Sequence, residues 1–155
     1  MLVVKLEESK GEVFTSQGIG NAISGFQSMS LSDDVETISK ALGLFADIIE
    51  ASSLPMSARD ISNAMFGLQG MTADCDEVRA VIIALTEKIR NTTDIFTSRD
   101  IGYCLSGLSL MQHTVYDEVN EFIDELTIQT SRSELKGEPN LSFFLFDRGI
   151  KVKKL

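Results

Sequence analysis

An internal repeat constrains the fold of this chain more than any other feature of its sequence. The segment FTSQGIGNAISGFQSM begins at Phe14, the similar segment MSARDISNAMFGLQGM begins at Met56, and FTSRDIGYCLSGLSLM begins at Phe96. Each copy is followed by a second stretch that opens with two acidic residues and a valine, at Val35, Val78 and Val119. A two-part unit that recurs about every forty residues is typical of stacked helical repeats. The three predicted repeats span 14–55, 56–95 and 96–130.

The first part of each repeat is predicted to form an amphipathic helix, and these parts are called A segments (15–29, 57–71 and 97–111). Their apolar residues follow the i, i+3, i+4, i+7 spacing of one helical face. This stripe consists of Ile19, Ala22, Ile23, Phe26, Met29, Ile61, Ala64, Met65, Leu68, Met71, Ile101, Cys104, Leu105, Leu108 and Met111. Ser57 and Thr97 stand three residues before Asp60 and Asp100, which predicts capping boxes. Gly18 takes the place of the acid in the first copy, so its box is incomplete.

The second parts, called B segments (33–50, 74–90 and 117–126), are predicted to be helical as well. Their stripe consists of Val35, Ile38, Leu42, Phe45, Ile49, Val78, Ile82, Leu85, Ile89, Val119, Phe122, Ile123 and Leu126. A single short helix pair cannot bury such stripes, whereas stacked pairs share a continuous core. The sequence therefore predicts an all-α fold, an α-solenoid of three helix-turn-helix repeats.

One glycine recurs at the same place in each A segment, at Gly25, Gly67 and Gly107. A glycine inside a helix costs about 1 kcal/mol relative to alanine. Because the cost is repeated three times, we expect these glycines to allow a close approach between neighbouring helix backbones.

Both ends of the chain depart from the repeat. Residues 1–13 are expected to form an N-terminal cap with strand character over 2–6, and residues 131–155 a C-terminal cap with strand character over 141–146 and a basic end. The two segments either pair with each other or each cover one open end of the core. Alternatively, the chain is one piece of a longer repeat protein.

Charge and composition favour a binding protein over an enzyme. The formal net charge is −9, and the acidic excess lies on the B segments, where it forms either a solvated outer face or a docking surface for a basic partner. Two cysteines and one histidine cannot assemble a Cys/His zinc site. No glycine-rich phosphate motif appears, so we expect no cofactor and no small-molecule substrate. The chain contains no apolar run that would insert into a membrane and no secretion signal, which favours a soluble protein of the cytoplasm or an organelle interior.

The candidate binding residues lie outside the apolar stripe and align between A segments. They are Arg59, Arg99, Asn21, Asn63, Tyr103, Phe66, Gln27 and Gln69. A ladder of amides with one or two aromatic rings is suited to hydrogen-bonding an extended peptide or the edges of bases. The alternative is that the amides brace neighbouring turns and that the aromatic side chains are packed.

The second repeat also carries a family resemblance. Its pattern Ile61, Asn63, Ala64, Gly67, Leu68 and Met71, followed by an acidic turn and a second helix, resembles the helical-pair repeats of algal and protist proteins, similar to octotricopeptide repeats. That resemblance implies single-stranded RNA binding by stacked A helices. The residues themselves favour a non-enzymatic protein-interaction scaffold or assembly subunit, with an octotricopeptide-like RNA-binding module as the alternative.

Overall fold

A computed structural model describes residues 2–9, 13–29, 34–111 and 115–134 of the chain. The elements are α1 (Leu2–Glu8), α2 (Ser16–Ser24), the 3₁₀ helix η1 (Gly25–Ser28), α3 (Val35–Ala51), α4 (Ala58–Gly67), α5 (Asp76–Asn91), α6 (Ser98–Gly107) and α7 (Asp117–Glu134). These ranges contain helices and no strand, which confirms the all-α prediction for this part of the chain. None of the helices found there has the length and apolar character needed to cross a membrane.

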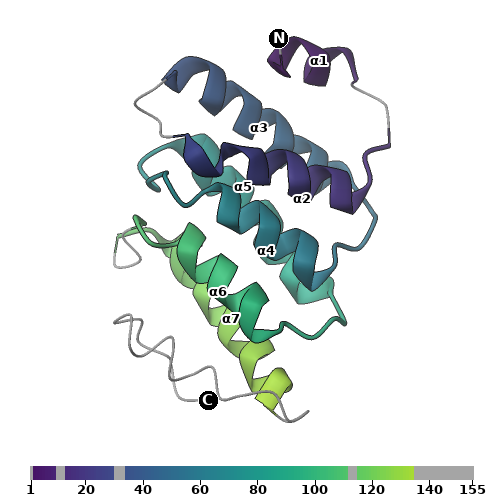
Figure 1. The fold of residues 1–155 in the computed structure, drawn as a ribbon, viewed down its shortest axis with the longest axis vertical. Coiled ribbons are helices and arrows are strands. Elements are labelled where there is room, and N and C mark those ends of the chain that lie inside the picture. The colour runs from purple at the N-terminus through teal and green to yellow at the C-terminus, as the bar shows by residue number, and fades with distance from the viewer. Residues whose placement is uncertain (1, 10–12, 30–33, 112–114, 135–155) are drawn as a thin grey trace.

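The helices are arranged in two rows (Figure 1). The A row consists of α2, α4 and α6, in which each helix packs against the next, and the B row consists of α3, α5 and α7, packed in the same order. The apolar stripes of both rows meet between them, with Phe45, Phe96 and Phe122 among the largest fully buried side chains. The A row therefore presents one broad face to the surroundings and the B row presents the opposite one.

The predicted capping boxes set the starts of the A-row helices. Ser57 accepts a hydrogen bond from the Asp60 backbone N–H, and the Asp60 carboxylate accepts one from the Ser57 N–H. Thr97 and Asp100 form the same reciprocal pair at the start of α6. In the first copy, Thr15 accepts from the Gly18 N–H, and the second half of the box is missing as predicted.

All three A-row helices are shorter than the sequence predicts, because α2 ends at Ser24, α4 ends at Gly67 and α6 ends at Gly107. These glycines are thus terminal residues of their helices and not interior ones. A Cβ atom on Gly67 would lie 2.0 Å from the Ile23 carbonyl oxygen of α2. A Cβ atom on Gly107 would lie 2.1 Å from the Met65 carbonyl oxygen of α4. The prediction of close backbone approach is therefore confirmed at both positions.

The first copy differs from the other two. No atom of the described residues would lie within 4 Å of a Cβ atom on Gly25, so the predicted close approach is wrong there. Ala22, Met29 and Val35 were expected in the buried stripe but are exposed. For Ala22 and Gly25 the physical reason is their position, since among the described residues no A-row helix lies on that side of α2. The other stripe residues of both segment types are buried.

The expected N-terminal strand is wrong, because Leu2–Glu8 forms helix α1. Val3 and Leu6 lie on the same helical face and are buried, and α1 packs against α3. Lys40 of α3 forms an ion pair with Glu7 at 2.9 Å. Burial of one face at a spacing of three residues outweighs the strand preference of the β-branched pair Val3–Val4. The strand expected at 141–146 and the basic end lie outside the described residues.

Candidate interaction surface

Five of the eight predicted binding residues come together in one polar depression on the A row. This A-row hollow has a volume of about 280 Å³ and draws residues from three successive helices. It is lined by Gln17 and Asn21 of α2, Arg59 and Asn63 of α4, and Arg99, Asp100 and Tyr103 of α6. Amide, guanidinium and phenol groups therefore face a common space.

Arg59 and Arg99 occupy the second position of α4 and α6, and both side chains are exposed. The carboxylates that follow them in sequence are engaged in the capping boxes, not in ion pairs with these arginines. Within the described ranges, no carboxylate lies within ion-pair distance of either guanidinium. Two positive charges thus remain available to a ligand at the hollow.

Arg99 is held in place by an aromatic pair. Its Nη2 donates a hydrogen bond to the Tyr103 hydroxyl at 3.0 Å, and its guanidinium carbon lies 5.2 Å from the centre of the Tyr103 ring. Tyr103 in turn stacks on Phe66 of α4, with ring centres 4.5 Å apart and an interplanar angle of 21°. The hydrogen bond with Tyr103 raises the pKa of Arg99 above its ordinary value, so the side chain is cationic throughout the physiological range.

Asp100 closes the inner wall of the hollow. It is buried, and its carboxylate accepts hydrogen bonds from the Thr97 N–H at 2.9 Å and from the Thr97 hydroxyl at 2.6 Å. A third bond, at 3.2 Å, comes from the hydroxyl of Ser62, which is fully buried in α4. This bond ties α6 to α4 and fixes the spacing between the helices that carry the two arginines.

The remaining predicted amides lie elsewhere. Gln69 donates from Nε2 to the Gln27 carbonyl oxygen at 2.9 Å and connects the end of α4 to η1. In the third repeat, the equivalent Ser109 donates from its hydroxyl to the Gln69 carbonyl oxygen at 3.4 Å. For Gln69 and Gln27 the alternative interpretation, bracing between neighbouring turns, therefore matches the contacts. Phe66 is half-buried and does not line the hollow itself. Its ring stacks on that of Tyr103, which does.

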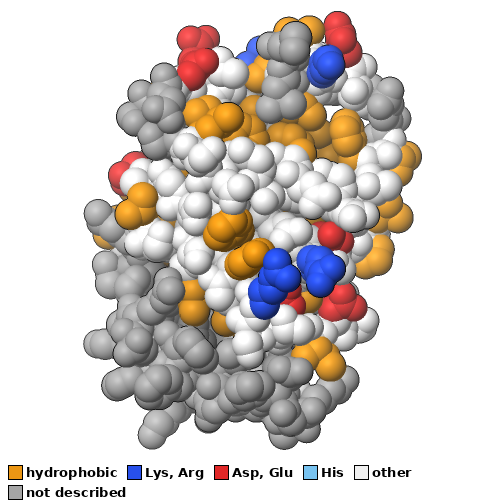
Figure 2. Space-filling model, viewed as in Figure 1, with side chains coloured by type: hydrophobic (Ala, Val, Ile, Leu, Met, Phe, Trp, Pro, Cys, Tyr) orange, Lys and Arg blue, Asp and Glu red, His pale blue; other side chains and the backbone are white. Residues whose placement is uncertain are grey.

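Figure 2 views the molecule from the side of the A row and shows basic side chains gathered on this face with acidic side chains beside them. On the B row, two arginines of α5, Arg79 and Arg90, are engaged by acids. Arg90 of α5 contacts the carboxylates of Glu87, Glu121 and Glu125, and these bonds raise its pKa further above the ordinary value. The sequence did not reveal this network, since its members come from two separate helices.

A second group of contacts also joins α5 to α7. Arg79 pairs with Asp76 and with Glu118, and its guanidinium carbon lies 4.9 Å from the centre of the Tyr116 ring. The Tyr116 hydroxyl donates a hydrogen bond to the Asp74 carboxylate, and this bond raises the pKa of the tyrosine. The N-cap of α5 is Cys75, which makes no capping hydrogen bond through its side chain.

The described residues show no group of three or more His, Cys, Asp or Glu side chains placed to hold a metal ion. Cys104 is fully buried in α6, and burial raises the pKa of its thiol well above the ordinary value. Cys75 is half-buried near Ser39 and Glu77. His113 lies outside the described residues.

Comparisons with protein-family models, with curated proteins and with solved structures found no match for the chain.

Proposed function

We propose that the chain is a short α-solenoid of three helix pairs that acts as a non-enzymatic interaction module. The A-row hollow binds an acidic segment of a partner protein. The observation that carries this proposal is the convergence of Arg59 and Arg99, neither paired with a carboxylate in the described ranges, on a hollow that also contains side-chain amides. Guanidinium groups bind carboxylates through paired, charge-assisted hydrogen bonds.

The solenoid interpretation is supported by the repeated helix contacts. Gly67 and Gly107 stand at equivalent positions of the repeat. Each lies against a carbonyl group of the preceding A-row helix, Ile23 and Met65 respectively, and these two residues are equivalent as well. In repeat proteins of this kind, successive units present equivalent side chains along one surface. Arg59 and Arg99 are such a pair, so a partner segment that runs across α4 and α6 meets two similar cationic sites.

The test uses a labelled synthetic peptide rich in Asp and Glu, with binding to the full chain followed by fluorescence anisotropy. Replacing both arginines (Arg59→Glu with Arg99→Glu) is expected to abolish binding, because attraction becomes repulsion. The melting temperature should stay close to wild type, since neither guanidinium forms a carboxylate ion pair within the described ranges. Equal binding by the variant would refute the assignment.

The matched control is Lys5→Glu with Arg132→Glu, which changes the net charge by the same amount. Both residues are exposed and lie on α1 and α7, away from the A-row hollow. We expect this control to weaken peptide binding only slightly, through long-range charge. A loss as large as that of the arginine pair would assign the binding to net charge alone.

A second candidate, single-stranded RNA, is favoured by the stacked rings of Phe66 and Tyr103 beside the arginines. Aromatic rings and guanidinium planes are the groups on which unpaired bases stack. A labelled single-stranded RNA oligonucleotide distinguishes the two ligands. RNA binding that weakens with salt and that Tyr103→Leu reduces further would favour this candidate over the acidic peptide.

A further inference from the structure

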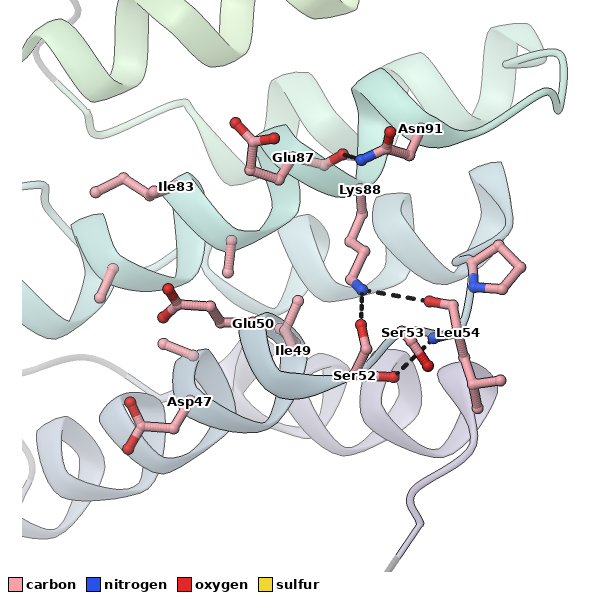
Figure 3. A pocket seen from close by; sticks show the side chains of 14 residues that line it. Asp47, Ile49, Glu50, Ser52, Ser53, Leu54, Ile83, Glu87, Lys88 and Asn91 are labelled. Atoms are coloured by element: carbon pink, nitrogen blue, oxygen red, sulfur yellow. Dashed lines mark hydrogen bonds between the residues drawn. The ribbon is translucent and has the colours of Figure 1, made fainter.

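The opposite row of helices carries a second depression, here called the B-row groove (Figure 3). It has a volume of about 580 Å³ and lies between the C-terminal half of α3 and the middle and end of α5. It is lined by residues 46, 47, 49, 50, 52–55, 80, 83, 84, 87, 88 and 91. It shares none of these residues with the A-row hollow.

Small and aliphatic side chains line much of the groove. Ala46 of α3 and Ala80 and Ala84 of α5 line it, and their short side chains leave space between the two helices unfilled. Two larger apolar residues border it, Leu54 with 41% and Ile83 with 47% of its surface exposed. Exposed aliphatic side chains on both sides of one depression are typical of a site that takes apolar groups from a partner.

The polar border of the groove is acidic. Asp47 and Glu50 stand one turn apart on α3, both are exposed, and neither forms an ion pair within the described ranges. Glu87 of α5 belongs to the Arg90 network, in which three carboxylates face one guanidinium, so negative charge is in excess there too. An opening with this charge repels acidic segments and attracts basic ones.

The one cation in the lining does not neutralise this border. Lys88 of α5 reaches across the end of the groove and donates from Nζ to the backbone carbonyl oxygens of Ser52 and of Leu54, the latter at 3.3 Å (Figure 3). Its burial lowers the pKa of the ammonium group. The lysine therefore anchors the loop after α3 and leaves Asp47 and Glu50 to a ligand.

From these observations we propose that the B-row groove binds a basic amphipathic helical segment of a partner protein. Aliphatic side chains of that segment enter between Leu54 and Ile83, and its Lys or Arg side chains pair with Asp47 and Glu50. Residues three or four positions apart on a helix supply both contacts from one face. The protein would thus hold an acidic ligand on one row and a basic one on the other.

The probe is a labelled synthetic peptide in which Leu recurs at helical spacing among Lys and Ala, with binding to the full chain measured by fluorescence anisotropy. Reversal of the two carboxylates (Asp47→Lys with Glu50→Lys) is expected to weaken binding about tenfold or more. Ile83→Ser should weaken it about fivefold, because an apolar contact is lost. Both variants should melt near the wild-type temperature, since these side chains are exposed.

The matched control is Glu8→Lys with Glu36→Lys, which changes the net charge equally at exposed positions outside the groove. If this control weakens binding as much as the groove pair does, or if Ile83→Ser has no effect, the proposal is wrong. A probe with Glu in place of every Lys is expected not to bind at the groove, and its binding there would also overturn the proposal.

Two results would assign the groove to another occupant and overturn the proposal. The first is self-association of the wild-type protein that the pair Asp47→Lys and Glu50→Lys abolishes, which would indicate a second copy of the chain. The second is peptide binding that is measurable only after residues 135–155 are removed, which would indicate the chain's own end. Binding that persists when Arg59 and Arg99 are replaced is expected, because the two surfaces share no residue.

Discussion

The inner helix contacts of the A row and the two ends of that row are built from the same repeat positions, but they differ in the space that they leave for a side chain. Gly67 and Gly107 lie against the backbone of the preceding helix, whereas the equivalent Gly25 has no such neighbour in the described part of the chain. A second pair of equivalent glycines, on the side of the A-row helices that faces the next helix, shows the same contrast. A Cβ atom on Gly20 would lie 2.7 Å from the Asp60 carbonyl oxygen, while one on Gly102 would have no neighbour within 4 Å among the residues that the structure describes.

This comparison shows that a repeated residue is not equally constrained in every copy. A side chain is excluded at a position only where a neighbouring helix lies against it, and the two terminal helices of the A row, α2 and α6, each lack an A-row neighbour on one side in the described part of the chain. The same sequence pattern therefore identifies a tight contact in the middle of the row and a merely permissive site at its ends.

The largest expected effect is the loss of stability when an inner glycine gains a side chain. Gly67→Ala and Gly107→Ala each place a Cβ atom about 2 Å from a carbonyl oxygen of the preceding helix. Because the obstructing atom belongs to the backbone, the helices have to move apart, and we expect each change to cost about 3 kcal/mol. Chemical denaturation monitored by circular dichroism measures this. A cost below about 1 kcal/mol at both sites would contradict the tight contact.

A smaller loss is expected at the acid that ties α6 to α4. Asp100 accepts from Thr97 and also from Ser62, whereas the hydrogen bonds that Asp60 accepts from described residues all lie within its own capping box. Asp100→Ala should cost about 2 kcal/mol, because it removes the cap and leaves the buried Ser62 hydroxyl with one partner fewer. Asp60→Ala, the matched change, should cost about 1 kcal/mol. Equal costs at both positions would show that the contact between helices adds nothing.

The end positions are expected to respond in the opposite direction. Gly102→Ala lies inside α6, and Gly25→Ala lies at the start of η1 with φ −60° and ψ −20°, a conformation that alanine adopts readily. Each change should raise stability by up to about 1 kcal/mol, since alanine favours helix and restricts the unfolded chain. A loss of stability at either site would indicate that the surrounding space is filled in solution.

Much of the helical framework could be predicted from the sequence, because it depends on local signals. The capping boxes at Ser57 and Thr97 and the apolar stripes required only the spacing of residues along the chain. The alignment of Arg59 with Arg99 predicted a shared surface, because stacked repeats bring equivalent positions together. These features follow from the repeat without knowledge of the neighbouring helices.

Other features depend on which helices are neighbours and were not visible in the sequence. The exposure of Ala22 and Gly25 follows from the end of the row, which no local pattern marks. The helical state of Leu2–Glu8 depends on its packing against α3. The B-row groove was missed for the same reason, since alanines in two separate helices form a depression only when those helices lie side by side.

The smallest expected effect on stability is that of Ala22→Cys, which places a thiol at the repeat position that Cys104 occupies in α6. Ala22 and Cys104 are equivalent, but Ala22 is exposed, while Cys104 is fully buried with a raised thiol pKa. In a Cys75→Ser background, the variant Ala22→Cys should be nearly as stable as its parent, because the new side chain projects into open space. Its thiol should react with a soluble disulfide reagent at least about a hundredfold faster than Cys104, since reaction requires an accessible thiolate. In denaturant both thiols should react alike, which serves as the control. Similar rates in the native protein would mean either that the end of the row is covered or that α6 opens freely, and the contrast between inner and end positions would then be lost.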